Sequence, residues 1–457
     1  MKPIRFFATL LAAVAFVACG EVPSEEPNNQ GGGNTSTKLS APTGLAVVEG
    51  SLTTTAVTIQ WNAVEGAVAY NYVLQQGAMR VAAEQTTATE VSFTELEKQT
   101  DYRFYVYAVA QTSANNSTAS QTLNFRTLSK EPSASGLPVP HCVVDAKGGG
   151  DYTTVQAALS AVPSSHEGMY IIHIKEGVYK EKISIESGRD NIILVGDGPE
   201  KTVLSHNGYQ GSGESVYSTL YIRGKNVTIM DMTIENTHQN LTGSGDQAQA
   251  VHVHYGDKVA FYNCRITGYQ DTFWGRSYES RIYLKDCYVE GNVDYIYGGS
   301  VILLDKCTLH VNRNNSVLTA PATPASAKFG IVCMDCKITT PAVGTVCFDG
   351  KAFSYFYLGR PWQNAPKSVF IRCEEPAALH ADGWTTMESL TNITFAEWNC
   401  SGAGYKPEGR KNHGRQLSAE EAAEYTKANI LAANSNPSGK FTEDWLPADE
   451  KPEISLE

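Results

Sequence analysis

The stretches that decide the fold are residues 258–268 (KVAFYNCRITG), 281–291 (RIYLKDCYVEG) and 301–311 (VILLDKCTLHV). Each holds a short apolar run, a small or polar pair, and a second short run. Most spacings fall between 20 and 35 residues, and looser copies occur at 191–198 (NIILVGDG), 226–236 (NVTIMDMTIEN) and 330–340 (GIVCMDCKITT). Such a period, with no twelve-residue helix between the runs, indicates stacked coils of short strands. The sequence therefore predicts a parallel β-helix rather than an α/β sheet.

Cysteines recur at one point of the repeat, in Asn263-Cys264, Asp286-Cys287 and Asp335-Cys336. Identical side chains align between coils, so we expect these thiols to form an internal stack of small, buried side chains. Nine cysteines follow residue 19, an odd number that does not suit a disulfide framework. Cys333 and Cys336 form a CxxC pair, but no second pair or histidine cluster follows at ligand spacing. Buried thiols are therefore favoured over a zinc or redox site.

Two segments are predicted to cover the ends of the solenoid. Residues 151–162 (DYTTVQAALSAV) place Thr153 or Thr154 as an N-cap before apolar residues at helical spacing. Ser418 and Glu421 have the spacing of a capping box, which predicts a helix running to about Ala433. Residues 448–457 are expected to form a disordered tail.

The N-terminal part of the chain has a different texture. Residues 20–40 are rich in Gly, Pro, Asn and Ser and predict a flexible tether, and residues 129–140 predict a second linker. Between them, over residues 41–128, alternating runs broken by turns indicate a small β-sandwich. The landmarks Trp61 and Tyr102 belong to a pattern that resembles a fibronectin type III domain. Such a module implies a spacer, with carbohydrate binding as the less favoured alternative.

Residues 1–18 are predicted to be an export signal. Two basic residues precede an apolar run that is too short to span a bilayer comfortably. The run ends in a stretch that resembles a bacterial lipoprotein box, with Cys19 as the lipidated residue. The resemblance implies anchoring to the outer membrane, and Ser24-Glu25-Glu26 resembles a tag for the cell surface. An ordinary signal peptide with an incidental cysteine remains the alternative.

The net charge of −12, with no run of Lys or Arg, argues against nucleic acid as a partner. An acidic protein also gains no long-range attraction toward a polyanion. An acidic polymer would therefore have to be bound locally or be partly neutral.

Three polar residues are spaced like the coils themselves. Gln249 and Asp271 are 22 positions apart, and Asp271 and Asp294 are 23 apart. Strands of adjacent coils lie about 4.8 Å apart, so these three side chains are expected to stack on one surface. Arg360 lies 66 positions beyond Asp294, or three such coils, and Gln270 would add a second amide.

This set of residues suits acyl transfer. Two close carboxylates titrate together, and one pKa rises, so that one can serve as a general acid. The other, kept ionised by an arginine, can act as a nucleophile, and nearby amides can stabilise an oxyanion. No metal or other cofactor is expected. Taken singly, each residue has an ordinary structural explanation, such as a turn aspartate or a surface arginine.

The local sequences around these residues resemble the pectin methylesterase (pectinesterase) family over residues 141–447. Six motifs occur in the family's order. They are GDYTTVQ at 150–156, GVYKE at 177–181, QAV at 249–251, GYQDTF at 268–273, DYIYG at 294–298 and LGRPW at 358–362. The resemblance implies an all-β chain, with a right-handed parallel β-helix as its catalytic domain and the β-sandwich before it.

The resemblance also implies roles for the site residues. Asp294 would attack the C6 methyl ester of pectin, and Asp271 would protonate the departing methanol and then activate water. Gln270 and Gln249 would form the oxyanion site. Arg360 would orient Asp294 and touch substrate.

Further residues are implied to contact the sugar chain: Thr219, Trp362, Tyr297 and Trp274. Phe273 and Tyr297 depart from the family's usual Leu and Phe, and Trp274 stands where Tyr is usual. These changes leave the chemistry intact and put subsite preferences in doubt. The expected partner is methyl-esterified pectin, and the protein is expected to be a monomer.

Three other functions compete with this one. A pectate lyase would share the β-helix but need an acidic calcium-binding cluster, which the sequence does not show. A decayed, non-catalytic polymer-binding lipoprotein is disfavoured because the motif residues are intact. An esterase or thioesterase of the same family, acting on another acyl group, remains the main alternative.

Overall fold

The computed structural model describes residues 38–48, 50–128, 137–166, 168–241 and 245–456. The predicted signal segment, Cys19 and the acidic tag at 24–26 lie outside these residues. The described chain divides into two compact units, and the boundary along the sequence falls between Val139 and Pro140. No helix in the described ranges is both long enough and apolar enough to cross a membrane.

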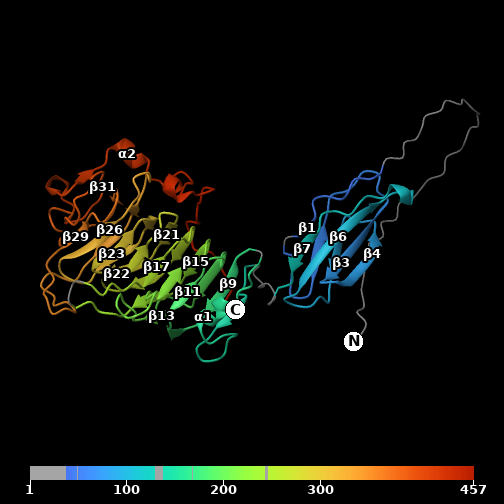
Figure 1. Cartoon of the computed structure of the whole chain (residues 1–457), viewed down its shortest axis with the longest axis horizontal. Coiled ribbons are helices and arrows are strands. Elements are labelled where there is room, and N and C mark those ends of the chain that lie inside the picture. The colour runs from blue at the N-terminus through green and yellow to red at the C-terminus, as the bar shows by residue number, and fades with distance from the viewer. Residues whose placement is uncertain (1–37, 49, 129–136, 167, 242–244, 457) are drawn as a thin grey trace, which may run out of the picture. The chain divides into compact units, whose positions relative to one another are not determined.

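The first unit is an antiparallel β-sandwich (Figure 1). One sheet has the order β1 (Ala46–Val47), β2 (Val57–Gln60) and β5 (Glu90–Phe93). The other has the order β4 (Met79–Thr86), β3 (Ala69–Gln76), β6 (Asp101–Val109) and β7 (Leu123–Arg126), and a short 3-10 helix, η1, spans Ser113–Asn115. Buried Trp61 packs on Phe104, with ring centroids 5.8 Å apart. The hydroxyl of buried Tyr102 accepts a hydrogen bond from the Glu97 backbone N–H at 2.9 Å.

The second unit is a parallel β-helix with three sheets, and its coils succeed one another from green to orange in Figure 1. The first sheet holds β10 (Gly177–Lys180), β13 (Thr202–His206), β16 (Thr233–Asn236), β19 (Arg265–Thr267), β22 (Tyr288–Gly291), β25 (Thr308–Val311) and β28 (Lys337–Thr339). The second, which we call the site sheet, holds β11 (Ile183–Ile185), β14 (Leu220–Ile222), β17 (Val251–Val253), β20 (Phe273–Gly275), β23 (Val293–Gly298), β26 (Ser316–Pro321) and β29 (Phe356–Gly359).

The third sheet, which we call the long sheet, has eleven strands. They are β8 (Cys142–Val144), β9 (Tyr170–Ile174), β12 (Ile192–Gly196), β15 (Val227–Met230), β18 (Val259–Tyr262), β21 (Arg281–Lys285), β24 (Val301–Asp305), β27 (Ile331–Met334), β30 (Lys367–Ile371), β31 (Thr394–Trp398) and β32 (Gly414–Gln416). One coil thus supplies one strand to each sheet, and Ile, Leu, Val and Phe side chains fill the interior. The predicted all-β fold class is confirmed.

The cysteine stack forms at the turn that leaves the long sheet. Asn263, Asp286 and Asp335 each adopt a left-handed backbone with φ of 48°, 53° and 53°, a conformation that Asn and Asp tolerate well. The cysteine that follows each of them points inward, and the thiol of Cys287 donates to the Phe261 carbonyl of the preceding coil at 3.5 Å. The stack is longer than predicted, because other residues also take the left-handed turn; it comprises Cys264, Cys287, Cys307, Cys336, Cys373 and Cys400.

All nine cysteines of the described chain are free thiols, and eight of them are buried as predicted, whereas Cys347 is half-buried. Cys333 lies on β27 and Cys336 in the stack, and burial raises the pKa of both. No group of His, Cys, Asp or Glu side chains within the described ranges is arranged to hold a metal ion.

The predicted capping helices form, with one difference. Helix α1 (Val155–Ala161) packs on β8 and β11, and its N-cap is Thr154, which accepts from the Ala157 N–H. The Ser418 and Glu421 capping box begins α2 (Ala419–Ala423), but this helix does not continue to Ala433. A second helix, α3 (Lys427–Ile430), starts at its own N-cap, Thr426. The predicted single helix is therefore wrong, because Thr426 ends one helix by starting another. Two short 3-10 helices, η2 (Pro407–Gly409) and η3 (Pro437–Gly439), complete the unit.

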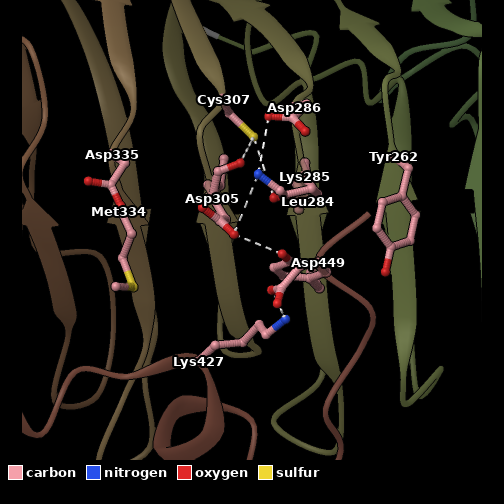
Figure 2. Close-up of polar contacts among 12 residues, drawn as sticks. Tyr262, Leu284, Lys285, Asp286, Asp305, Cys307, Met334, Asp335, Lys427 and Asp449 are labelled. Atoms are coloured by element: carbon pink, nitrogen blue, oxygen red, sulfur yellow. Dashed lines mark hydrogen bonds and ion pairs between the residues drawn. The ribbon is translucent and has the colours of Figure 1, made fainter. Parts of the chain in front are cut away.

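Residues 448–456, for which the sequence predicts a disordered tail, lie against the long sheet. The Ala448 carbonyl accepts a hydrogen bond from Tyr262 at 3.0 Å, and Lys451 pairs with Asp231 at 2.5 Å. Figure 2 shows Lys427 pointing toward Asp449, beside the Lys285 and Asp305 side chains of the long sheet. The prediction considered the composition of the tail alone, whereas polar partners on the sheet hold the segment.

Candidate active site

The predicted row of polar residues exists at the start of the site sheet. Val251, Phe273 and Ile296 are register partners on β17, β20 and β23. Gln249, Asp271 and Asp294 each stand two positions before one of these partners, so they occupy equivalent places in three successive coils. The spacing of the sequence therefore predicted their stacking correctly, and all three residues are buried.

Unusual backbone conformations aim the two carboxylates. Asp271 and Asp294 have φ of 65° and 52°, in the left-handed region. The pairing of β23 with β26 also shifts register between Val293 and Ile296, as at a β-bulge. The Asp271 N–H donates to the Val293 carbonyl at 2.9 Å, which joins the two coils. Bulges and left-handed residues re-aim side chains, and both features occur here at the carboxylates.

Arg360 follows β29 and binds only one of the two aspartates. Its Nε donates to Asp294 Oδ1 at 2.8 Å, and its Nη2 donates to Asp294 Oδ2 at 2.6 Å. This two-point contact fixes the plane of the Asp294 carboxylate and favours its ionised form. Its partner on the neighbouring coil, Asp271, makes no ion pair among the described residues.

The surroundings of Asp271 and Asp294 give their carboxyl groups different pKa values. Burial first, and the charge of Asp294 second, raise the pKa of Asp271 well above its ordinary value. Burial also raises the pKa of Asp294 above its ordinary value, and the hydrogen bonds and charge of Arg360 offset part of that rise. The pair therefore suits one protonated and one ionised carboxyl group, with the proton on Asp271.

Two amides accompany the carboxylates. Gln249 Nε2 donates to the Tyr297 hydroxyl at 2.8 Å, and Tyr297 and Gln270 both hydrogen-bond to Asp271. The Gln270 Oε1 atom accepts from the Asn240 side-chain amide, so that the Gln270 NH₂ group faces the carboxylates. Asn240 was not predicted, since it belongs to no repeat and to none of the six motifs.

Thr219 does not lie where the resemblance placed it. Its side chain is fully buried, and its hydroxyl donates to the Glu235 carbonyl at 2.7 Å. Leu220 is the register partner of Val251, so Ser218 rather than Thr219 occupies the position equivalent to Gln249. Successive strand residues point to opposite faces, which turns Thr219 away from the row. Thr219 thus lies apart from the row, and its implied substrate contact stays a prediction.

Aromatic residues continue from the carboxylates along the site sheet. Trp274 stacks on Tyr297 at 5.2 Å between ring centroids and on His252 at 4.2 Å. Trp362 meets Tyr297 edge to face at 5.5 Å. Trp274 and Trp362 are partly exposed and line a cavity of about 320 Å³, whereas Tyr297 is buried beneath them. The structure thus brings together all the predicted site residues except Thr219. Flat aromatic faces beside paired carboxylates suit a sugar ring held next to reactive groups.

Comparisons with known proteins agree with this geometry. The pectinesterase family model matches residues 141–434, and the fibronectin type III domain model matches residues 40–126. A probable pectinesterase/pectinesterase inhibitor of Arabidopsis thaliana is 32% identical over 324 residues, which cover 68% of this chain and 53% of that relative. A pectinesterase of Daucus carota is 30% identical over 317 residues, which cover 66% of this chain and 96% of that relative.

A solved structure of a pectin methylesterase from carrot is similar over 67% of this chain and 98% of its own, with a TM-score of 0.59 and 27% identity. The chain spans about half the length of three Arabidopsis relatives, at 53%, 49% and 50%. The family model nevertheless covers more than half of this chain. The chain therefore belongs to the pectinesterase family, with a fibronectin type III domain before the family domain.

Proposed function

We propose that this protein is a pectin methylesterase, which hydrolyses the C6 methyl esters of polygalacturonan to methanol and free carboxylates. The observation that carries the proposal is the unequal pair of buried carboxyl groups in adjacent coils. Asp294 is bound at two points by Arg360, whereas Asp271 has no cation of its own. Family membership supplies the substrate class.

In the first step the ionised Asp294 attacks the ester carbonyl. A tetrahedral oxyanion forms, and amide N–H donors from Gln270 and Gln249 stabilise its charge. When it collapses, the bond to the methoxy group breaks and the proton of Asp271 passes to the departing methanol. The sugar is then joined to Asp294 as a mixed anhydride, and Asp271 is ionised.

In the second step Asp271 acts as the base. It takes a proton from a water molecule, whose oxygen attacks the acyl carbon bound to Asp294. The acyl bond breaks, which regenerates ionised Asp294 and leaves Asp271 protonated, and the released galacturonic acid loses its proton to solvent and becomes a free carboxylate. Arg360 keeps Asp294 in place through both steps, and no metal ion is required by this scheme.

Methanol release from methylated pectin tests the proposal. The intact protein should release methanol without the ultraviolet absorbance of an unsaturated product, and Asp294→Ala should abolish the release. Asp286→Ala is a matched control, because Asp286 is a left-handed aspartate in a turn of the same unit but half exposed and away from the row. Full activity of Asp294→Ala would refute the mechanism. Cleavage of other esters without methanol release from pectin would favour an esterase of different specificity.

We also propose that the protein is exported and anchored to the outer membrane through a lipid on Cys19. The basic and apolar residues before Cys19 and the lipoprotein-like sequence around it support this. Metabolic labelling with a radioactive fatty acid should mark the wild type and not Cys19→Ser, and labelling of both would contradict it. The catalytic row lies within one chain, which supports a monomer; sedimentation of the protein without its signal segment tests this.

A further inference from the structure

The outer face of the four-stranded sheet in the fibronectin type III domain carries aromatic side chains that the core does not use. On β6 the even-numbered residues 102–108 are buried in the core of the sandwich. Side chains alternate along a strand, so Arg103, Tyr105 and Tyr107 point to the opposite face. Both tyrosines are partly exposed, and neither packs against that core. Their rings are therefore available to a ligand.

The two tyrosines are flanked by amide groups. Their rings meet edge to face, with centroids 5.8 Å apart, and so form one continuous aromatic surface. Asn71 on β3 lies directly opposite both Tyr107 on β6 and Gln85 on β4. Gln85 Nε2 donates to Asn71 Oδ1 at 2.9 Å, which leaves the Asn71 NH₂ group and the Gln85 Oε1 atom on the surface. Aromatic rings beside amide donors and acceptors suit a sugar, which has apolar C–H faces and a rim of hydroxyls.

Two arginines share this face. Gln75 on β3 lies directly opposite Arg103 on β6 and Arg80 on β4, so the three side chains project from the same side of the sheet. Arg103 Nη2 donates to the Gly77 carbonyl at 3.0 Å, which holds its guanidinium over the end of the hairpin. Both arginines are exposed, and neither forms an ion pair with any residue that the structure describes.

The acids of the same strands do not neutralise these arginines. Asp101 shares the face, but it pairs with Arg126 at 3.0 Å. Glu84 on β4 lies opposite buried Tyr72 and accepts a hydrogen bond from the Tyr72 hydroxyl at 3.2 Å, so it belongs to the other side of the sheet. The face is therefore positive within a chain of net charge −12, and its charge suits an anionic occupant.

We propose that this face binds a second stretch of the pectin chain, outside the catalytic unit. Tyr105 and Tyr107 would lie against sugar rings, and Arg80 and Arg103 would contact the carboxylates of uronates that carry no methyl ester. The identity of the polymer rests on the proposed function. The face itself supplies the chemical class, since a free carboxylate accepts charge-assisted hydrogen bonds from arginine whereas a neutral sugar would leave both cations unused.

A second binding site on the same chain would make the fibronectin type III domain more than a spacer. A polymer held at this face stays near the catalytic unit, because the two units belong to one polypeptide. Binding at the second site is then intramolecular, and the apparent affinity for a long polymer rises without any new contact at Asp271 or Asp294. A short oligomer that fills one site gains nothing from the other.

Calorimetric titration of the two-domain protein with polygalacturonate tests the site without turnover. We expect Tyr105→Ala/Tyr107→Ala and Arg80→Gln/Arg103→Gln each to raise the apparent Kd about tenfold. High salt should weaken binding by wild type more than binding by the arginine variant, which has fewer charge contacts to lose. Wild-type affinity in both variants would overturn the proposal.

Two control variants match these changes in size and in charge. Thr58→Ala/Ser92→Ala alters a directly opposed pair on β2 and β5 of the other sheet, where the two hydroxyls lie 2.9 Å apart. Lys180→Gln/Lys337→Gln removes the same charge as the arginine variant, from two exposed positions on the first sheet of the β-helix. Both controls should bind polygalacturonate like wild type, and a tenfold loss in either would contradict the assignment of the site to this face.

Methanol release separates this site from the catalytic site. On long, partly de-esterified pectin, KM of the tyrosine variant should rise about tenfold with kcat unchanged, whereas KM on a methylated trimer should stay as in wild type. An equal rise of KM on both substrates would overturn the second site. Absence of methanol release by wild type would instead refute the proposed function, and the titration would still test the face.

Sedimentation distinguishes pectin from a second copy of the chain as the occupant. We expect wild type and Tyr105→Ala/Tyr107→Ala both to be monomers in the absence of polymer. A wild-type dimer that dissociates in the tyrosine variant would show that the face binds another copy, which would contradict the proposal.

Discussion

Two arginines of the β-helix hold pairs of carboxyl groups in opposite ways. Arg360 binds Asp294 at two points and leaves the second aspartate of the site without a cation. Arg410, near the C-terminal end, binds both of its acids. Its Nε and Nη2 donate to Glu397 at 2.7 and 2.8 Å, and Nη2 also donates to Glu375 at 2.8 Å. Each arginine thus lies beside two carboxyl groups, but Arg360 forms hydrogen bonds to only one of its two, whereas Arg410 forms hydrogen bonds to both.

The two sets also differ in their access to solvent. The side chains of Arg360 and Asp294 are 25% and 11% exposed, whereas those of Arg410 and both glutamates are 1% exposed or less. Burial, and then the charge of Glu397, raise the pKa of Glu375 to about 10. A raised pKa is therefore not sufficient for catalysis. The two carboxyl groups of a reactive pair must also differ in protonation and be accessible to substrate.

The largest effect expected from this difference follows from Asp294→Asn. The substitution keeps the shape of the side chain but removes the nucleophile, so kcat should fall by about 10³-fold or more. Glu397→Gln is the corresponding change in the buried group formed by Arg410, Glu375 and Glu397. It should leave kcat of the folded enzyme within about twofold. Methanol release measured for both variants decides the point. A tenfold or smaller loss in Asp294→Asn would mean that the two sets do not differ in function.

The next largest effect concerns stability. Arg410→Met leaves two buried acids without their cation, and removing one partner from a buried ionic group typically costs about 3–5 kcal/mol. Urea unfolding of the intact protein, followed by a probe of the β-helix, should show this loss. The kcat of the fraction that remains folded should be unchanged. An unfolding free energy like that of wild type would show that the contacts of Arg410 with Glu375 and Glu397 do not stabilise the fold.

Arg360→Gln should change the pH dependence of kcat/KM. Arg360 lowers the pKa of Asp294 against the effect of burial, so its removal should raise that pKa. The nucleophile must be ionised, and the acidic limb of kcat/KM should therefore move to higher pH, with a loss of about 10²-fold at neutral pH. The alkaline limb, which reports loss of the Asp271 proton, should remain. A rate loss that is equal at all pH values would contradict this role of Arg360.

Glu375→Gln should give the smallest effect. An acid whose folded pKa is raised contributes stability that is full below its unfolded pKa and is lost as pH rises through the folded value. For Glu375 that window runs from 4.5 to about 10. The glutamine variant should therefore match wild type near pH 5 and exceed it by an increasing margin as pH rises through mildly alkaline values. Unfolding free energies at the two pH values test this, and an equal difference at both would contradict it.

The repeat pattern predicted the parts of the molecule that repeat. The strands around Cys264, Cys287 and Cys336, the thiol stack, and the equivalence of Gln249, Asp271 and Asp294 all follow from one spacing. These features were predictable because adjacent coils impose the same environment on equivalent residues.

Features that depend on contacts outside the repeat, which occur at a single place in the fold, were not predictable. The register of β14 turned Thr219 inward, although its motif position suggested a substrate contact. Thr426 divided a predicted helix in two. Arg410 meets Glu375 and Glu397 from positions 35 and 13 residues away, with no repeat to indicate the meeting. Such contacts arise from the three-dimensional path of loops and not from the period of the strands.

The central claim is that Asp271 is protonated while its neighbour Asp294 is ionised. Infrared difference spectroscopy between wild type and Asp271→Asn at neutral pH tests it most directly. The buried carboxyl group of Glu375 is protonated in both proteins, so its signal cancels in the difference spectrum. We predict that wild type has one additional carbonyl band of a protonated carboxyl group. An additional band of an ionised carboxylate in its place would contradict the account.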